Sequence, residues 1–90
     1  MQNKISTWED MVNAEYPISD IKKDSPEFEI MKNAAKNGDP SAQHSMGIWY
    51  GEVAKDLEKA KNWYRRAAGE GREGAQESYT DLLYSENNEV

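Results

Sequence analysis

The amino-acid sequence predicts an all-α protein, a short right-handed α-solenoid of antiparallel helix pairs with about five helices. Two observations lead to this prediction. Start and stop signals for helices recur along the chain, and a segment in its middle is similar to the segment 33 residues later. No run alternates between apolar and polar residues, and no hairpin turn joins two such runs, so nothing predicts a strand.

The first helix is predicted over about residues 7–15. Ser6-Thr7-Trp8-Glu9 has the form of a capping box, with Ser6 as the N-cap and Glu9 three positions later. Pro17 ends this helix because a proline disfavours helical backbone before it. Residues 16–24, YPISDIKKD, lack helical periodicity and are expected to form a connector.

The next two helices have similar start signals. Ser25-Pro26-Glu27 supplies an N-cap, a proline at the first helical position and an acid in the first turn. That helix is expected to stop at Gly38. Asp39-Pro40 then starts a third helix over residues 40–50, which should end at Gly51 and lead into a short loop.

Two further helices complete the predicted set. Asp56 is the N-cap of the fourth helix, which Gly69 or Gly71 should close. The last helix is expected over about residues 73–85. The apolar positions that share one side of these two helices are Leu57, Ala60, Trp63, Tyr64 and Ala67, and then Ala75, Tyr79, Leu82 and Leu83.

An internal repeat relates the second and third helices to the fourth and fifth. A shift of 33 residues pairs Ala34 with Ala67, Ala35 with Ala68, Gly38 with Gly71, Ala42 with Ala75, Gln43 with Gln76 and Ser45 with Ser78. Small residues at these places allow two helices to approach closely, and the glycine supplies a left-handed turn between them. Helix pairs repeated at this period are typical of an α-solenoid.

Residues 34–71, AAKNGDPSAQHSMGIWYGEVAKDLEKAKNWYRRAAGEG, are similar to a Sel1-like repeat, a relative of the tetratricopeptide repeat. The family pattern is a paired alanine and a glycine, then A-x-x-x-L-G-x-x-Y, a loop with Val and Asp, and E-K-A-x-x-W-Y-x-x-A-A. The matching positions are Ala42, Met46 in place of Leu, Gly47, Tyr50, Val53, Asp56, Glu58-Lys59-Ala60, Trp63-Tyr64 and Ala67-Ala68. The resemblance implies paired helices whose first members line a concave, partner-binding side.

The resemblance also divides the chain into parts. Residues 25–85 are expected to form one full repeat with flanking half-repeats, preceded by an N-terminal helix and connector in residues 1–24 and followed by a polar tail, 86–90. The chain departs from the pattern in a shorter loop after Gly51, which implies a tightly joined helix pair. Thr80 stands where the family has glycine, which suits a terminal helix that no further helix covers.

Residues 59–71, KAKNWYRRAAGEG, interleave cations with aromatic residues. Such a stretch could be a nucleic-acid surface, a membrane-facing helix or a helix with one buried side. Trp63 and Tyr64 fall in the packing register of the repeat, so they are expected to belong to the core. The remaining cations, Lys59, Lys61, Arg65 and Arg66, are expected on the solvent side of the same helix.

Composition and charge limit the classes of function that the sequence allows. The 90-residue chain has a net charge of −6, no cysteine and no apolar leader or membrane-spanning run, so we expect a soluble cytoplasmic protein without a disulfide or thiolate metal site. Residues 1–30 sum to −4, 55–72 to +3 and 73–90 to −5. Acidic ends argue against nucleic acid and favour a basic protein partner.

No set of residues predicts catalysis. His44 is the only histidine, and no carboxylate or second ligand lies three or four residues from it. The sequence also lacks a Walker motif, a nucleophile elbow and a Gly-rich nucleotide loop. We therefore expect no catalytic, cofactor or metal site, and a small-molecule ligand is not expected.

The predicted partner-binding positions lie on the first helix of each pair. They are the positions there that the repeat does not use for packing: His44, Ile48, Glu52, Glu77, Asp81 and Tyr84. Together they would form an acidic stripe with one apolar and one aromatic anchor, suited to a basic segment. That these residues form only a solvated face stays open as an alternative.

These observations predict a non-catalytic protein–protein interaction module. Its most concrete form is a small acidic inhibitor or immunity protein that neutralises a basic partner such as a toxin. The alternative is a structural or adaptor protein that self-associates or scaffolds a complex. An enzyme is not expected, and a nucleic-acid role through Lys61, Arg65 and Arg66 would require binding that is sensitive to salt.

Overall fold

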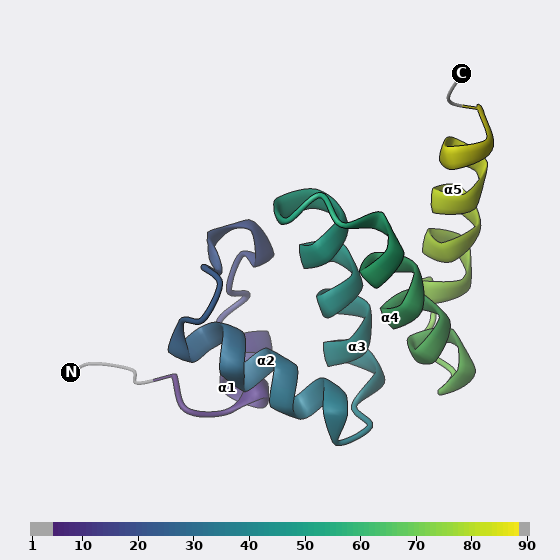
Figure 1. The fold of residues 1–90 in the computed structure, drawn as a ribbon. Helices are drawn as coiled ribbons and strands as arrows, with labels where there is room; N and C mark the ends of the chain where they lie inside the picture. Colours follow the sequence, from purple (N-terminus) through teal and green to yellow (C-terminus); the bar gives the residue numbers. More distant parts are fainter. Residues whose placement is uncertain (1–4, 89–90) are drawn as a thin grey trace.

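A computed structural model describes the backbone of residues 5–88 and the side chains of residues 5–85. This part of the chain is helical and contains no β-strand (Figure 1). Its five α-helices are α1 (Trp8–Asn13), α2 (Pro26–Lys36), α3 (Pro40–Ile48), α4 (Leu57–Gly69) and α5 (Ala75–Asn88). A 3₁₀ turn, η1 (Ile18–Asp20), lies between α1 and α2, and a π-helical turn, η2 (Trp49–Val53), continues α3.

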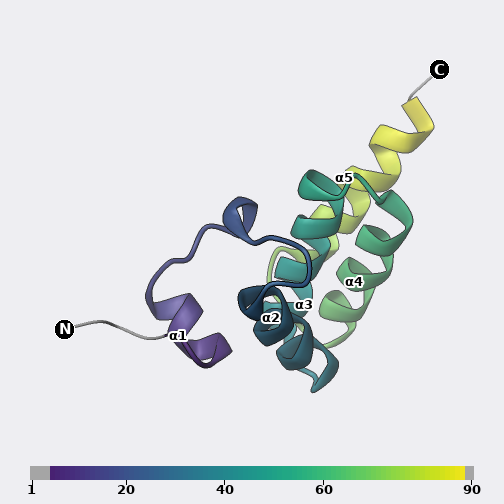
Figure 2. The same cartoon turned by 60° about the vertical axis from the view of Figure 1, so that its left-hand side comes forward.

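The helices α2 to α5 pack one against the next along the long direction of the molecule, and α1 lies against α2 (Figures 1 and 2). The molecule measures 51 × 25 × 18 Å along its principal axes. Each helix therefore contacts mainly its neighbours in the sequence, and α5 forms one end of the row.

Side-chain caps define where the helices begin. Ser25, Asp39 and Asp56 are the N-caps of α2, α3 and α4 as predicted, and each accepts a hydrogen bond from a backbone N–H in the first turn. The first capping box lies one residue later than predicted. Thr7 is its N-cap, and its reciprocal partner is the Asp10 carboxylate rather than Glu9.

The boundaries differ from the prediction in three places. The helix α1 ends at Asn13 because the backbone reverses at Glu15, which has a φ of 53°. The expected loop after residue 50 is partly the π-helical turn η2, and the Asp56 N–H donates to the Tyr50 carbonyl at 2.8 Å. The last helix runs to Asn88 and so includes three residues of the expected polar tail.

The two turns separated by 33 residues have the same hydrogen bonds. Gly38 has a φ of 101° and Gly71 a φ of 88°, a region that glycine enters without steric cost. Their N···O distances are Gly38 to Ala35 3.1 Å, Asp39 to Ala34 3.1 Å, Gly71 to Ala68 3.0 Å and Arg72 to Ala67 2.9 Å. The repeat in the sequence therefore corresponds to a repeated local structure.

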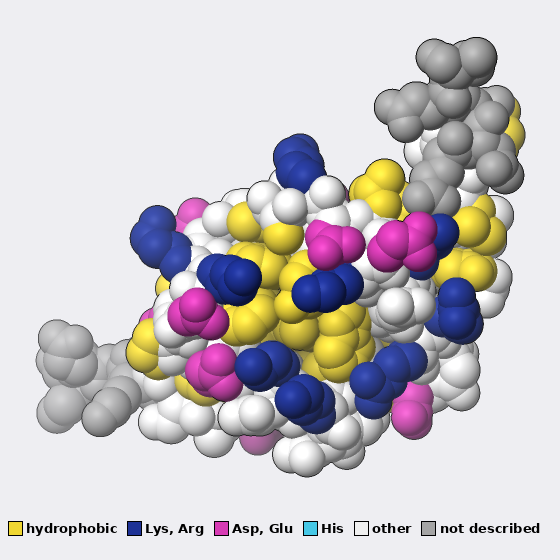
Figure 3. Space-filling view, viewed as in Figure 1, with side chains coloured by type: hydrophobic (Ala, Val, Ile, Leu, Met, Phe, Trp, Pro, Cys, Tyr) yellow, Lys and Arg dark blue, Asp and Glu magenta, His cyan; other side chains and the backbone are white. Residues whose placement is uncertain are grey.

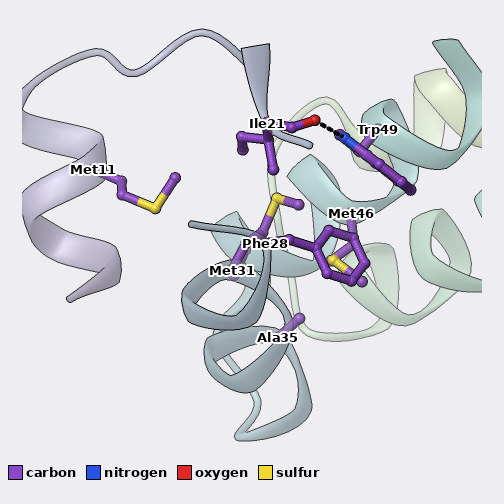
Figure 4. Close-up of a cluster of buried hydrophobic side chains, with 8 residues drawn as sticks. Met11, Ile21, Phe28, Met31, Ala35, Met46 and Trp49 are labelled. Carbon is purple, nitrogen blue, oxygen red and sulfur yellow. Dashed lines mark hydrogen bonds between the residues drawn. The ribbon is translucent and has the colours of Figure 1, made fainter. Parts of the chain in front are cut away.

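One cluster of buried side chains joins the first three helices, the connector and η2 (Figure 4). Its buried members are Met11, Ile21, Phe28, Met31, Ala35, Ala42, Met46 and Trp49. The Trp49 indole Nε1 donates a hydrogen bond to the Ile21 carbonyl at 2.8 Å. Residues outside the repeat, Met11 and Ile21 among them, thus complete the core, so the N-terminal segment docks on the other helices.

The contact between α3 and α4 depends on Gly47. A Cβ atom at this position would lie 2.5 Å from two ring carbons of Tyr64, so only glycine allows the helices to approach this closely. Ala60 and Ala67 of α4 and Ala75 of α5 are fully buried. A Cβ atom at Gly51 would lie 3.5 Å from that of Ala60, so small residues also allow η2 and α4 to pack closely.

Candidate protein-binding groove

A groove of about 290 Å³ lies between η2 and α5, with α4 as its floor. Glu52 comes from η2, and Asp81 and Leu82 come from α5. Leu57 and Tyr64 of α4 form the floor, and the rest of the lining is Gly51, Ser78 and Ser85. The groove therefore combines two carboxylates with an apolar and aromatic floor.

The periodicity of α5 explains which of its residues reach this groove. Ser78, Asp81, Leu82 and Ser85 follow the spacing i, i+3, i+4 and i+7, so they share one stripe of the helix. Ala75 is buried against α4 and holds the start of the helix in place. The floor residue Tyr64 lies under the groove because Gly47 leaves space for its ring.

The electrostatics of the groove favour a cation. The side chains of Glu52 and Asp81 are exposed. Burial raises the pKa of the Tyr64 hydroxyl, and the nearby Glu52 charge raises it further. Tyr64 therefore stays neutral and protonated at physiological pH, and the two carboxylates supply the charge.

His44 joins α3 to α5 beside this groove. Its Nε2 atom lies 3.1 Å from the Ser78 hydroxyl, and its ring centroid lies 5.6 Å from that of Tyr64. The side chain is half-buried, and its pKa is lowered by burial and by the positive charge of Arg72. The imidazole is thus part of the packing between helices. Its contact with Ser78 could not be predicted from local spacing, because Ser78 lies 34 residues away in the chain.

The structure brings together only some of the predicted partner-binding residues. Glu52 and Asp81 line one groove, and His44 lies behind it through its contact with Ser78. Glu77 and Tyr84 are exposed on α5, seven residues apart and therefore on one side of the helix, but they do not line the groove. Ile48 is half-buried on α3 and also lies outside the lining.

The floor of the groove was missed in the sequence. Leu57, Tyr64 and Leu82 were assigned to packing, and they do pack, but one side of each also lines the groove. The spacing of Ser78, Leu82 and Asp81 was the available signal for a stripe on α5. Which stripe faces η2 depends on how α5 crosses α4, and a single sequence does not contain that angle.

Three cations of residues 59–71, Lys59, Arg65 and Arg66, lie over aromatic rings. Lys61 is half-buried, which differs from the expected solvent side, and its Nζ atom lies 3.0 Å from the Glu58 carboxylate. Arg66 lies 4.6 Å from the Trp63 ring centroid, and Arg65 lies 5.6 Å from that of Tyr79. Tyr64 is buried as predicted, whereas Trp63 is only partly buried at the edge of the core. The stretch is therefore largely architectural, with its cations covering the outer faces of the aromatic residues.

Residues 5–88 contain no helix long and apolar enough to cross a membrane. Among the side chains of residues 5–85, His, Asp and Glu do not gather in groups of three that could hold a metal ion.

Comparison of the chain with models of protein families gives no match, and neither does comparison with curated proteins or with solved structures. The function is therefore argued from the geometry of the groove.

Proposed function

We propose that this protein is a non-catalytic module that binds a basic segment of another protein in the groove between η2 and α5. The observation that carries this proposal is the meeting of Glu52 and Asp81 above an apolar floor. A lysine or arginine side chain of a partner could place its aliphatic stem on Leu57 and Leu82 and its charge between the carboxylates.

The proposal includes the arrangement of the helices. We take the two helix pairs as a short right-handed α-solenoid of the Sel1-like kind, in which the first helix of each pair lines the binding side. The matching hydrogen bonds at Gly38 and Gly71 and the row of helices along one axis support this. The groove would then be the part of the concave side between two first helices.

The most concrete form of this function is an inhibitor or immunity protein that neutralises a basic toxin. A net charge of −6 would accelerate encounter with a basic partner through long-range attraction. A chain without cysteine also suits a reducing compartment such as the cytoplasm. The alternative role, a scaffold, would use the same groove without blocking the activity of its partner.

A site-specific cross-linker tests the proposal. A photoreactive amino acid is placed at Ser85 in the groove or at Asn62, an exposed residue of α4 outside the groove lining. We expect the Ser85 probe alone to capture a basic protein in the native cell. Capture at both positions, or of an acidic protein, would contradict the groove as the binding site.

Co-expression then distinguishes inhibition from scaffolding. The wild-type chain should abolish the toxicity or activity of the captured protein. The groove variant Glu52→Lys/Asp81→Lys should lose this effect, whereas a matched variant of two exposed acids outside the groove, Asp20→Lys/Glu70→Lys, should keep it. A partner that is bound but fully active would establish the scaffolding role instead.

A further inference from the structure

A second surface of opposite charge lies on α2, η2 and α4. We call it the aromatic–basic face, and it consists of Phe28, Tyr50 and Trp63 with the cations Lys32, Lys59 and Arg66. The distances from cation to ring centroid are 5.8 Å for Lys32 on Phe28, 5.4 Å for Lys59 on Tyr50 and 4.6 Å for Arg66 on Trp63. Figure 3 shows hydrophobic side chains at the centre of this side of the molecule, bordered by lysines and arginines with several acidic side chains between them.

The face is continuous. The Phe28 and Tyr50 rings meet edge to face at a centroid distance of 6.4 Å, and Trp63 packs against the same buried cluster. Lys59, Trp63 and Arg66 follow the spacing i, i+4 and i+7, so they form one stripe of α4. Tyr50 and Trp63 remain partly exposed beneath flexible cations.

This face fits an occupant that offers both negative charge and an aromatic anchor. A cation gains little from lying over a ring, so the charges of Lys59 and Arg66 stay available to a carboxylate. Lys32 is already paired with Glu29, at 3.5 Å. Aromatic side chains supply most of the binding energy at protein interfaces, and a partly exposed aromatic floor receives them well. An acidic helix with one exposed tyrosine has both properties.

The chain itself carries such a helix. Residues 73–90 contain five acids and no cation. Glu77 and Tyr84 lie seven residues apart on the solvent side of α5, and Tyr84 is 71% exposed, the largest value among the large hydrophobic residues described. They lie outside the groove, which uses the neighbouring stripe of the helix.

The two surfaces cannot meet within one molecule. The Ala75 side of α5 is buried against α4, so its Glu77 and Tyr84 side faces away from the body that carries the aromatic–basic face. We infer that the aromatic–basic face of one copy binds the outer side of α5 of a second copy, head to tail. Such a contact uses two different patches, so it either closes into a ring or extends into a chain of copies.

Sedimentation of the purified full chain tests this inference. We expect the average mass to rise with protein concentration at low ionic strength and to return to that of one copy at high ionic strength. The face variant Lys59→Glu/Arg66→Glu and the α5 variant Glu77→Lys/Tyr84→Ala should each weaken self-association by at least about tenfold. Circular dichroism verifies that both variants remain helical.

Mixing the two variants supplies the decisive result. The unchanged α5 of the face variant meets the unchanged face of the α5 variant, so the mixture should regain association that neither variant has alone. Lys22→Glu/Lys23→Glu, which changes two exposed lysines of the connector, should behave like the wild type.

Three results would overturn the inference. They are a single copy at every concentration, association that high ionic strength does not weaken, and a mixture that stays dissociated. Binding of a polyglutamate peptide or a DNA oligonucleotide without self-association would assign the face to another occupant. Every variant keeps Glu52 and Asp81, so failure here leaves the proposed basic partner of the groove untouched.

Discussion

The Gly47 position shows how one missing side chain sets the distance between two helices. Gly47→Ala places a methyl group 2.5 Å from the Tyr64 ring, which is itself held by the His44 ring. We expect this variant to lose about 1–3 kcal/mol of unfolding free energy, because the ring or the helix must shift. Urea denaturation measures the loss.

The matched control is Gly69→Ala at the end of α4. A Cβ atom at Gly69 meets no atom within 4 Å, and its backbone does not adopt a positive φ. We expect a change between zero and a gain of about 1 kcal/mol, since alanine restricts the unfolded chain. Equal losses at the two positions would show that packing against Tyr64 is not the cause.

His44 should make stability depend on pH. Its pKa in the folded protein lies below the ordinary value of 6.5, so the unfolded chain binds more protons. The stabilisation is complete above pH 6.5 and is lost as the pH falls through the folded-state pKa. His44→Gln should flatten this decline, and urea denaturation at several pH values measures it.

Asp10 also makes stability depend on pH, but over a lower pH range than His44 does. Hydrogen bonds from the backbone N–H groups of Ser6 and Thr7 lower the pKa of Asp10 from 3.8. The contribution of Asp10 to the free energy of unfolding is present above pH 3.8 and is lost only below that value. A decline in His44→Gln as steep as in the wild type near pH 6 would rule out the imidazole as its source.

At the scale of elements, one side-chain hydrogen bond, from the Trp49 indole, joins the connector to η2 in addition to the buried apolar contacts. Trp49→Phe removes the hydrogen bond to the Ile21 carbonyl and leaves a buried acceptor unsatisfied, at a cost of about 1–3 kcal/mol. We expect the free energy of unfolding to fall and the connector, residues 16–24, to become more sensitive to proteolysis. Limited proteolysis followed by mass spectrometry measures the second effect.

Trp8→Phe is the control for this change. The Trp8 Nε1 atom is buried but has no hydrogen-bond partner among the described residues, so its removal costs no hydrogen bond. Both variants lose a similar part of an aromatic ring. If Trp8→Phe loosens the connector as much as Trp49→Phe does, ring volume and not the hydrogen bond holds the segment.

Most of the helical elements could be predicted from the sequence, because caps and glycine turns depend on residues close together in the chain. Ser25, Asp39 and Asp56 each satisfy backbone donors within three residues, so the start of each helix can be derived without the fold. The π-helical turn at Trp49 was not predictable, since ordinary α-helical continuation differs from it by only one register of hydrogen bonds. The docking of Met11 and Ile21 depends on contacts with distant residues, which no local pattern encodes.

The candidate site was predictable only in part for the same reason. Glu52 and Asp81 were recognised as exposed acids on first helices, and their charge could be derived from the sequence alone. Their meeting across the Tyr64 ring requires the crossing geometry of three helices. The family resemblance indicated which helices should line a binding side but not which stripe of α5 would do so.

At the scale of the whole molecule, stability should fall from the middle of the row to its end. The helices α3 and α4 share the most extensive contact, whereas α5 packs mainly on α4 and forms the end of the row. We expect amide hydrogens of α3 and α4 to exchange slowest and those in the second half of α5 to exchange fastest. Hydrogen exchange read by NMR on a dilute sample measures this order.

The same hydrogen-exchange experiment at high protein concentration tests the inferred self-association. Protection of α5 should increase when its outer side is covered by a second copy. A uniform exchange rate in all five helices at low concentration would contradict the proposed gradient and indicate a single cooperative unit.

The hydrogen bond from Trp49 to Ile21 joins residues 28 positions apart. During synthesis the N-terminal segment therefore leaves the ribosome before the surface that receives it has been made. Residues 5–24 must wait in water until α3 and η2 emerge. The helices α2 and α3 are joined by a short turn, so they can pair as soon as α3 is made. Residues 5–24 are thus made before α3 but acquire their place only after it, and for that interval they are open to chaperones and proteases.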